Sequence, residues 1–301
     1  MSKRTKAHAA VLAANFIFGA NFSIVKYVTP AVIQPFALNI LRVLVTGLLF
    51  WISFSIKPTK AGINKKDIWL FILCAATGVA INQMLFIKGL SLTTSIHAAL
   101  LMLATPIFII FIAAFLLKDK LSILKVAGLV LGVAGAVNLI LMRDSGPLAK
   151  DVITGDILVL INAISYAVYL VIVRPLMNNY SGVHVTRWLF TIGFFMMVPF
   201  GWNDFIETDW NAIGPSHWIA IAVIVIPGTF FAYLFNIYGV QTIGAAATGA
   251  YIYTQPVFAA VIAMIFLGEE FTVSKAISAV LIFAGVYLAN FKSTPKERLE
   301  E

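Results

Sequence analysis

Two stretches decide the fold: "ATPIFIIFIAAFLLKDKLS" at residues 104–122 and "TQPVFAAVIAMIFLGEEFT" at residues 254–272. Each is a long apolar run with a proline inside it, and the two prolines, Pro106 and Pro256, stand 150 positions apart. A proline within a helix removes a backbone donor and clashes with the preceding turn, which weakens the helix by ~3 kcal/mol or more. Because the same defect recurs at matching places, we expect two related halves in one chain.

The composition is that of an integral membrane protein. The chain of 301 residues is 61% hydrophobic and 11% charged, with a mean hydropathy of +0.96, whereas a soluble domain is usually about 25% charged. The net charge of +8 then reflects membrane topology rather than nucleic-acid binding. The single cysteine, Cys74, lies in an apolar run and excludes an intramolecular disulfide. The basic start "MSKRTK" leads into an apolar segment without a cleavage site, which predicts an uncleaved first helix.

The hydrophobic runs predict an all-α protein with ten transmembrane helices, because a span needs about 20 apolar residues. The loops between them are short and leave no room for a separate soluble domain. The predicted spans are residues 7–28, 35–56, 67–89, 93–117, 122–142, 155–177, 184–202, 215–238, 245–267 and 273–291.

Basic residues predict the orientation, because Lys and Arg are enriched on the cytoplasmic side. With the N-terminus inside, the outer half holds only Lys26, Arg42, Lys88, Arg143, Lys150 and Lys275. The remaining fifteen of the 21 Lys and Arg residues fall on the inner side. The longest outer loop, "NDFIETDWNAIG", carries three acids and no base. Both termini are therefore predicted to be cytoplasmic, in a cell (inner) membrane.

A gapless comparison of residues 82–141 with residues 232–291 supports the repeat. Outside the apolar matches, Gly89 meets Gly239, Pro106 meets Pro256, Lys125 meets Lys275 and Gly135 meets Gly285. The earlier helices align more loosely: Asn15 with Asn162 and Arg42 with Arg187. Five helices in each half force the second half to enter the membrane upside down. Inverted repeats of this kind are typical of transporters, with the site near the midplane between the halves.

The motifs also carry a resemblance to a known family. "NFIFGANFSIVK", "LNILRVLVTGLLF", the mid-helix prolines, "FLGEEFT" and the closing "AGVYL" resemble the EamA-like family of the drug/metabolite transporter superfamily. The likeness covers both halves, residues 1–145 and 152–292, followed by a tail at 293–301. The chain departs from the family pattern at "KDK" (118–120), where Gly-Glu is usual, and at Phe18-Gly19, where Trp-Gly is common. The second departure bears on the pocket.

The resemblance implies a fold and an activity. Helices 1–4 and 6–9 would surround a central cavity, and helices 5 and 10 would buttress it from outside. The family moves small metabolites, often outward. In helix 5, the small-residue surface of Gly128, Gly132 and Gly135 is interpreted first as a helix-packing face and second as a dimer seam. The protein is thus expected to be a monomer or a homodimer.

Polar side chains inside the predicted helices are the candidate substrate-binding residues, because an amide facing lipid is poorly satisfied. Interhelical hydrogen bonding is the favoured interpretation for any one of them, and a substrate-binding pocket is the favoured interpretation for the set. Pro106 and Pro256 are predicted hinges that shape opposite gates, with a static packing kink as the alternative. The predicted substrate-binding residues are Asn15, Arg42, Asn82, Gln83, His97, Asn162, Tyr166, Tyr169, Asn236, Tyr251 and Gln255.

The charged residues refine this expectation. All thirteen acids are predicted in loops or at helix ends, with Asp67 and Asp156 opening helices, which argues against carboxylate-based proton coupling. Arg42 and His97 would make the outer half of the cavity positive and suited to a carboxylate. Lys26 and Lys88 either join them or extend to the membrane interface.

The sequence therefore predicts a secondary or facilitative transporter of small metabolites, amino acids first, working by alternating access as an exporter or exchanger. A lipid or lipid-linked-sugar flippase is the alternative, and a non-transporting scaffold is the third reading. No P-loop, metal-ligand cluster or nucleophile elbow is present in the sequence. We accordingly expect no enzyme activity, no cofactor and no nucleic-acid partner; the partners would be a small-molecule substrate and the lipid bilayer.

Overall fold

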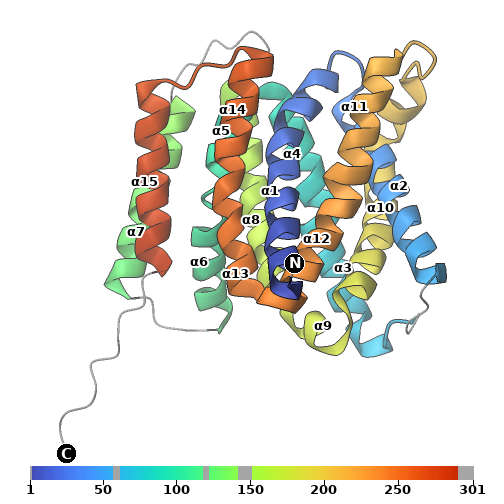
Figure 1. Ribbon diagram of the computed structural model, residues 1–301, viewed down its shortest axis with the longest axis horizontal. Helices are drawn as coiled ribbons and strands as arrows, with labels where there is room; N and C mark the ends of the chain where they lie inside the picture. The colour runs from blue at the N-terminus through green and yellow to red at the C-terminus, as the bar shows by residue number, and fades with distance from the viewer. Residues whose placement is uncertain (1, 57–61, 118–121, 142–150, 291–301) are drawn as a thin grey trace, which may run out of the picture.

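The computed structural model describes residues 2–56, 62–117, 122–141 and 151–290, and this part of the chain folds into a bundle of helices without a strand (Figure 1). Ten helical segments in it are long and apolar enough to cross a membrane, which confirms the predicted ten-helix architecture. These candidate spans are Lys3–Val28, Pro35–Ile56, Lys65–Leu92, Ser95–Leu116, Ile123–Leu141, Val152–Ile172, Gly182–Glu207, Pro215–Ile243, Ala247–Leu267 and Val273–Asn290.

Several spans consist of more than one helix. A short 3₁₀ turn, Lys65–Asp67, precedes α3, and Pro199 lies inside α10 without ending it. The helices are α1 (Lys3–Val28), α2 (Pro35–Ile56), α3 (Ile68–Ala75), α4 (Ile81–Leu92), α5 (Ser95–Met102), α6 (Thr105–Leu117), α7 (Ile123–Leu141), α8 (Val152–Ile172), α9 (Arg174–Asn179), α10 (Gly182–Glu207), α11 (Pro215–Val225), α12 (Ala232–Ile243), α13 (Ala245–Ala250), α14 (Gln255–Leu267) and α15 (Val273–Asn290).

Three predicted span ends differ from the structure by five residues. The eighth span ends at Ile243 rather than at residue 238. The sixth span ends at Ile172 rather than at residue 177, and a separate helix, α9, follows. Pro175 explains the interruption, because its ring opposes a continuous helix through the preceding turn. The seventh span continues to Glu207 rather than ending at residue 202. Residues 203–207, the first part of the predicted outer loop 203–214, are therefore helical.

The third and eighth spans each contain a π-helical turn, Ala76–Ala80 between α3 and α4, and Ile226–Phe231 between α11 and α12. The two turns start 150 residues apart, the same offset as the prolines. At Gly228 a Cβ atom would lie 2.4 Å from Nδ2 of Asn21, and at Gly78 it would lie 2.5 Å from the Tyr169 ring. Glycine thus lets the first helix of each half approach a π-helical turn of the other half. Such turns are frequently found at functional sites.

Pro106 and Pro256, which stand 150 residues apart, each follow a break in the helix rather than a gentle kink. In the fourth span, α5 ends at Met102 and α6 begins at Thr105. In the ninth span, α13 and α14 are joined by a 3₁₀ turn, Tyr251–Thr254. Pro106 cannot donate to the Met102 carbonyl, which accepts a hydrogen bond of 2.7 Å from the Thr105 hydroxyl instead.

The main helix–helix contacts join the first half of the chain to the second half. Helix α1 packs most extensively on α12, and α8, its counterpart in the second half, packs most extensively on α4. Helices α2 and α10 pair with each other, as do α7 and α15. Every one of these pairs joins the first five spans to the last five. The chain is therefore an all-α membrane protein of ten spans in two inverted five-helix repeats around a central cavity.

Helices α7 and α15 stand together at one end of the bundle (Figure 1). Their backbones approach so closely that a Cβ atom on Gly128 would lie 2.6 Å from the Gly285 carbonyl oxygen. A Cβ atom on Gly135 would lie 2.9 Å from the Ser278 carbonyl oxygen. The glycine surface of the fifth span is thus a packing face within the chain, as the first of the two interpretations predicted.

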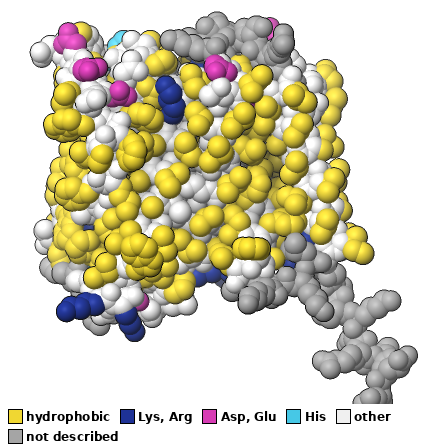
Figure 2. All heavy atoms as spheres, turned by 180° about the vertical axis from the view of Figure 1, so that it is seen from behind, with side chains coloured by type: hydrophobic (Ala, Val, Ile, Leu, Met, Phe, Trp, Pro, Cys, Tyr) yellow, Lys and Arg dark blue, Asp and Glu magenta, His cyan; other side chains and the backbone are white. Residues whose placement is uncertain are grey.

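The start of α1 and the end of α15 lie at the same face of the bundle, hereafter the N-terminal face (Figure 1). On the side shown in Figure 2, exposed hydrophobic side chains cover the middle of the bundle, most acidic side chains lie near the opposite face and most basic ones near the N-terminal face. The predicted tail at 293–301 and the basic residues of segments 57–61, 118–121, 142–150 and 291–301 lie outside the described residues. Which face is cytoplasmic therefore stays a prediction.

Candidate functional site

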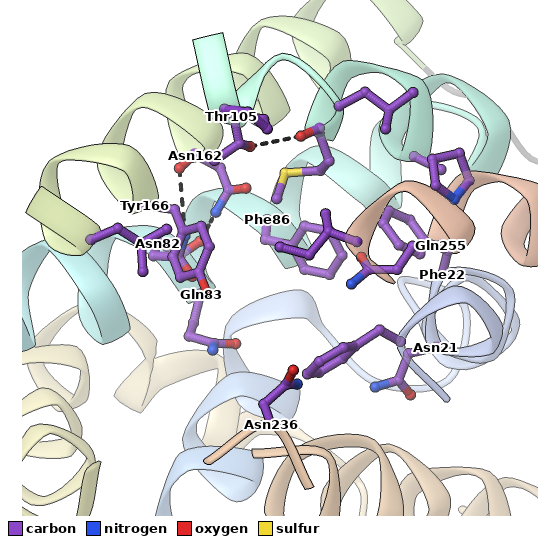
Figure 3. Close-up of a pocket in the computed structure, with 18 of the residues that line it drawn as sticks. Asn21, Phe22, Asn82, Gln83, Phe86, Thr105, Asn162, Tyr166, Asn236 and Gln255 are labelled. Atoms are coloured by element: carbon purple, nitrogen blue, oxygen red, sulfur yellow. Dashed lines mark hydrogen bonds between the residues drawn. The ribbon is translucent and has the colours of Figure 1, made fainter. Parts of the chain in front are cut away.

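A cavity of about 230 Å³ lies between the two halves (Figure 3). All of its lining residues come from spans one to four, six, eight and nine. The polar lining residues are Asn21, Arg42, Asn82, Gln83, Thr105, Asn162, Tyr166, Tyr233, Asn236 and Gln255. The apolar ones are Phe18, Phe22, Phe86, Ala99, Met102, Leu103, Pro106, Ile109, Leu170, Ile252 and Pro256.

Seven of the eleven residues predicted to bind substrate line this cavity, and so do both predicted hinge prolines. The seven are Arg42, Asn82, Gln83, Asn162, Tyr166, Asn236 and Gln255. Figure 3 shows that Gln83, Asn162 and Tyr166 face Asn21 and Gln255 across one space, with Asn236 beside it. Their contact with a substrate stays a prediction.

Four predicted residues have other surroundings. The Asn15 Oδ1 atom accepts a hydrogen bond of 2.7 Å from the lining residue Gln255. Asn15 therefore contacts a lining residue but does not itself line the cavity. Tyr169 contacts Tyr166 with a ring-centroid distance of 5.7 Å and packs on Gly78. The Tyr251 hydroxyl is 2.9 Å from Nδ1 of His8 near the N-terminal face.

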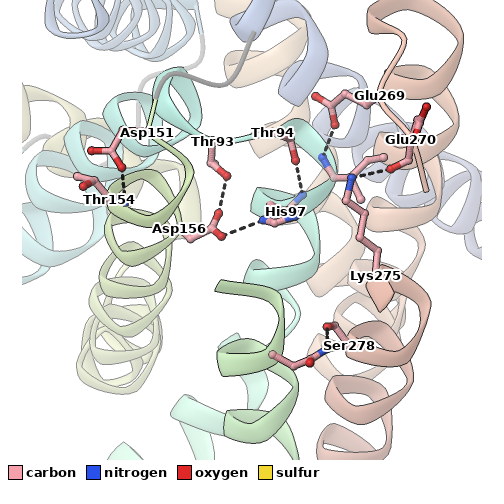
Figure 4. A network of polar contacts seen from close by, with 12 residues as sticks. Thr93, Thr94, His97, Asp151, Thr154, Asp156, Glu269, Glu270, Lys275 and Ser278 are labelled. Atoms are coloured by element: carbon pink, nitrogen blue, oxygen red, sulfur yellow. Dashed lines mark hydrogen bonds and ion pairs between the residues drawn. The ribbon is translucent and has the colours of Figure 1, made fainter. Parts of the chain in front are cut away.

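The fourth residue, His97, is fully buried away from the cavity. Its Nδ1 atom is 2.8 Å from the Asp156 carboxylate, which is itself 0% exposed. Asp156 lies in the second turn of α8, which begins at Val152, so the expectation that every acid sits in a loop or opens a helix is wrong. His97 and Asp156 thus form a buried pair of ionisable side chains between two candidate spans (Figure 4). Burial of a charge within a membrane is costly and requires specific polar partners.

Lys26 is also buried rather than extended to the interface. It is 4% exposed, and its Nζ atom donates hydrogen bonds to the carbonyls of Leu90 (3.2 Å), Ser91 (3.5 Å) and Thr93. These carbonyls stand at the C-terminal end of α4, where intrahelical donors are missing and a cation is favoured. The interfacial alternative is therefore wrong for Lys26.

Some lining residues were missing from the predicted set, namely Asn21, Tyr233 and the phenylalanines. Tyr233 stands 150 residues after Gln83 and three residues before Asn236, so the repeat offset and the helical spacing both point to it. Phe18, Phe22 and Phe86 carry no polar atom, and nothing in the sequence separates them from lipid-facing phenylalanines.

Arg42 is the only charged residue that lines the cavity among the described residues. It is 5% exposed, and its Nε atom donates to the Thr229 hydroxyl at 2.7 Å. That hydroxyl donates in turn to the Ile224 carbonyl at 2.9 Å within the π-helical region, which fixes the guanidinium. The Nη1 atom has no hydrogen-bond partner in the described part of the chain. A buried donor on a cation is costly unless an acceptor is supplied.

The cavity wall also carries amide oxygens with unused hydrogen-bonding capacity. The Oδ1 atoms of Asn21 and Asn162 and the Oε1 atom of Gln83 lack partners among the described residues. Asn162 and Asn82 bond to each other's backbone carbonyls, at 2.7 Å and 3.5 Å, which orients both side chains. The cavity lining therefore offers a fixed cationic donor, neutral acceptors and aromatic rings, a combination that suits a small molecule with an anionic group and an amine.

The cavity lies near the middle of the bundle. On α1, which starts at the N-terminal face, its lining residues lie past the midpoint of the helix, whereas on α8 they run from the midpoint, Asn162, to Leu170 near the N-terminal face. At the opposite face, the whole segment Thr93–Leu101 is buried. The layer around His97 and Asp156 thus separates the cavity from that face.

Comparison with known proteins identifies the family. The EamA-like transporter family matches residues 5–141 and again residues 153–291. The chain belongs to the EamA-like transporter family. It is 23% identical over 297 residues to the uncharacterized transporter YetK of Bacillus subtilis strain 168, covering 97% of this chain and 89% of YetK.

Two further similarities bear on function and fold. A probable terminal-alkyne amino-acid exporter of Streptantibioticus cattleyicolor is 25% identical over 236 residues, covering 77% of this chain and 76% of the exporter. A solved crystal structure superposes with a TM-score of 0.62 at 19% identity, covering 95% of this chain and 97% of that one. The structural likeness supports the fold alone. This EamA-like transporter is a multi-pass membrane protein that acts on a small-molecule substrate.

Proposed function

We propose that this EamA-like transporter carries amino acids across the membrane by alternating access, as an exporter or exchanger. The observation that carries the proposal is Arg42, a buried cation that lines the cavity and whose Nη1 atom has no hydrogen-bond partner in the described part of the chain. A carboxylate is the group that matches a guanidinium in charge and geometry. The unpaired amide oxygens of Asn21, Gln83 and Asn162 would accept hydrogen bonds from the substrate's ammonium group.

The arrangement of the helices supports alternating access. Residues 1–145 and 152–292 would act as two repeats that rock against each other around the cavity, and the two proline breaks would serve as hinges at opposite ends. The relative from Streptantibioticus cattleyicolor, named as a probable amino-acid exporter, agrees with this substrate class. Transport needs no covalent chemistry, and we propose no enzyme activity.

We further propose that the N-terminal face is cytoplasmic and that the protein resides in the cell's inner membrane. The acidic side chains at the opposite face and the basic ones at the N-terminal face support this orientation (Figure 2), because Lys and Arg are retained on the cytoplasmic side. Impermeant labelling of tags on both termini in intact cells tests it, and reaction of either tag would contradict it.

Uptake of a panel of radiolabelled amino acids into proteoliposomes, by counterflow, tests the substrate class. Arg42→Gln should reduce uptake about tenfold or more, because one charge-assisted contact is worth about 1.4 kcal/mol or more. Arg174→Gln is the matched control, since Arg174 is an exposed arginine on α9 and does not line the cavity.

Two results would contradict the proposal. Equal loss of uptake in both arginine variants would show that Arg42 has no special part in binding. Absence of counterflow with every amino acid, together with scrambling of fluorescent lipid by the same proteoliposomes, would favour the flippase alternative.

A further inference from the structure

The π-helical turn Ile226–Phe231, between α11 and α12, holds two polar residues of the cavity by hydrogen bonds. The backbone carbonyl of Gly228 accepts a hydrogen bond of 3.0 Å from the Nδ2 atom of Asn21. The hydroxyl of Thr229, the next residue, accepts one of 2.7 Å from the Nε atom of Arg42. Because Asn21 belongs to α1 and Arg42 to α2, one turn of the second repeat anchors two lining residues of the first repeat.

We infer that Thr229 is a positioning residue of the substrate site, whose hydroxyl holds the Arg42 guanidinium in the orientation that binds the anionic group of the substrate. Thr229 is 0% exposed and does not itself line the cavity, so it acts through Arg42. The inference rests on the proposed function in one respect only, namely that Arg42 binds an anionic group. It applies to any small carboxylate, whether or not the molecule also carries an amine.

The hydrogen bonds of Thr229 suit it to this role. Its hydroxyl proton goes to the Ile224 carbonyl at 2.9 Å, so the oxygen is left as an acceptor for Arg42. A free arginine side chain has many rotamers, and restricting it costs conformational entropy. Because the guanidinium is planar, a fixed Nε atom limits the directions in which the other N–H groups point. The Nη1 atom, without a partner in the described part of the chain, stays available for a carboxylate.

The first repeat offers a comparison within the same chain. The residue 150 positions before Thr229 is Val79, which lies in the other π-helical turn and has no hydroxyl. The counterpart of Arg42 is Arg187, whose guanidinium lies 3.9 Å from the centroid of the Phe54 ring and does not line the cavity. Thus the arginine whose π-helical turn carries a threonine lines the cavity, and the arginine whose turn carries a valine does not. This difference points to the hydroxyl as the group that directs Arg42 to the site.

Asn21 provides an internal control, because it lines the same cavity but is held differently (Figure 3). Its anchor is the backbone carbonyl of Gly228, which no change of the side chain at Thr229 removes. Its Oδ1 atom, which lacks a partner among the described residues, is the proposed acceptor for an ammonium group. Loss of the Thr229 hydroxyl should therefore impair recognition of an anionic group and spare recognition of an amine. A general disturbance of the site would impair both.

The test measures binding of three ligands to the full-length protein in detergent. The ligands are L-leucine, isocaproate, which is leucine without its amine, and isoamylamine, which is leucine without its carboxylate. The leucine side chain suits the apolar lining residues Ile109, Leu170 and Ile252. The dissociation constant of each ligand comes from the rise of the melting temperature with its concentration, relative to an equal concentration of sodium chloride.

Thr229→Val removes the hydroxyl with little change in shape and introduces the residue that the first repeat has at this position. It should weaken binding of leucine and isocaproate about fivefold or more and leave binding of isoamylamine unchanged, because only the first two use a charge-assisted contact to Arg42. Thr229→Ser keeps the hydroxyl and should bind all three ligands as the native protein does. In an Arg42→Gln background, Thr229→Val should cause no further loss, since Thr229 acts through Arg42.

Thr46→Val is the matched control. Thr46 lies one turn beyond Arg42 on α2, is 0% exposed, does not line the cavity and has a hydroxyl without a partner in the described part of the chain. Its replacement should leave the dissociation constants of all three ligands at their native values.

The inference is overturned if Thr229→Val binds the three ligands as the native protein does, if it weakens all three equally, or if its effect persists in the Arg42→Gln background. Failure of both leucine and isocaproate to stabilise the native protein would overturn it as well. Should Thr229→Val not fold, Thr229→Ala takes its place with the same expected pattern.

The proposed function fails separately. Absence of amino-acid counterflow, together with binding of isocaproate that depends on Thr229, would reject amino acids as substrates and support this inference. Amino-acid counterflow with an unchanged KM in Thr229→Val would support the proposed function and overturn this inference.

Discussion

The fourth and ninth spans occupy equivalent places in the two repeats but differ in their surroundings. Segment 95–105 of the first repeat is almost entirely buried, and Glu269 caps the start of its helix α5. In segment 247–255 of the second repeat only Thr248 is buried. The start of its helix α13 has no side-chain cap, and its contact with α1 includes an exposed hydrogen bond between Tyr251 and His8.

This difference shows that equivalent segments of an inverted repeat need not be in equivalent states. The segment of the first repeat seals one end of the cavity, and the segment of the second repeat, near the other end, is only partly buried. In a symmetrical transport cycle the two would exchange these states. The contacts that exist at only one end are therefore the contacts that select the conformation described here.

The largest expected difference between the repeats concerns two equivalent glycines. A Cβ atom on Gly89 would lie 2.8 Å from the Gly155 carbonyl oxygen, whereas one on Gly239 would meet the side chains of Val11 and Thr248. A side chain can move aside more easily than a backbone. We expect Gly89→Ala to destabilise the protein by about 2–3 kcal/mol and Gly239→Ala by about 1 kcal/mol or less. Unfolding in detergent with increasing denaturant measures both, and equal losses would contradict the asymmetry.

The Glu269 cap should give the next largest effect. Glu269→Ala leaves the buried N–H groups of Ser95 and Ile96 without acceptors, which should lower stability by about 1–3 kcal/mol. Glu270→Ala is the matched control, because the residue is exposed and its backbone carbonyl, which accepts from Lys275, remains in the variant. Thermal unfolding in detergent compares the two, and an unchanged melting temperature in Glu269→Ala would show that the cap does not hold the sealed end.

Replacement of the two prolines tests the hinge hypothesis. Pro106→Ala and Pro256→Ala each restore a backbone donor at a helix break, which should straighten the helix while the protein still folds. We expect each to change the transport rate about fivefold, equivalent to roughly 1 kcal/mol in the barrier. Counterflow kinetics in proteoliposomes measure the effect. Unchanged kinetics in both variants would leave the breaks as static features of packing.

The smallest effect should appear at the first helices of the two repeats. Helix α1 is capped by Ser2, which accepts from the Thr5 N–H, and α8 is capped by Asp151, which accepts from the Thr154 N–H. The side-chain and backbone hydrogen bonds from Thr154 lower the pKa of Asp151. Its contribution is therefore complete above the unfolded-state pKa of about 3.9 and is lost as the pH falls through the folded value.

Acidification should thus loosen the start of α8 and leave the start of α1 unchanged. Hydrogen exchange of residues 152–156 and 3–7, corrected for the intrinsic pH dependence, measures this. In Asp151→Ser the response at α8 should disappear, because serine caps without titrating. Persistence of the response in that variant would assign it to another group.

Much of the fold could be predicted from the sequence because two strong signals agree. Hydropathy marks ten spans, and the constant offset of 150 residues relates Gly89 to Gly239 and Pro106 to Pro256. The π-helical turns and α9 could not be placed in this way. The π-helical turns lie where helices of different repeats contact each other, as the Asn21 side chain contacts Gly228, and local sequence does not encode that contact. Pro175 is a local signal for the interruption before α9, but a continuous hydrophobic run concealed it.

The site was predictable where helices are regular. Asn82, Gln83, Asn162 and Tyr166 lie on continuous helices, and helical spacing brings them to the cavity. Tyr251 and Gln255, four residues apart, would share one face of a regular helix. The 3₁₀ turn Tyr251–Thr254 changes the repeat from 3.6 to about 3 residues per turn, and Tyr251 does not line the cavity.

Burial of charge was the hardest feature to predict. The partners of Lys26 are backbone carbonyls more than sixty residues away, at Leu90, Ser91 and Thr93. The partner of Asp156 is a histidine 59 residues earlier. Neither arrangement leaves a local pattern, so each residue taken alone resembles an interfacial charge.

The exchange of first helices between the repeats also has a consequence for biosynthesis. Helix α1 leaves the ribosome first, yet its main partner, α12, begins more than two hundred residues later, at Ala232. Until the eighth and ninth spans have been inserted, α1 must remain in the membrane without α12 and without Gln255, the partner of Asn15. A nascent chain arrested after five spans therefore lacks the main packing partners of its helices. A single repeat made on its own would need a second copy, inserted with the opposite topology, to complete its packing.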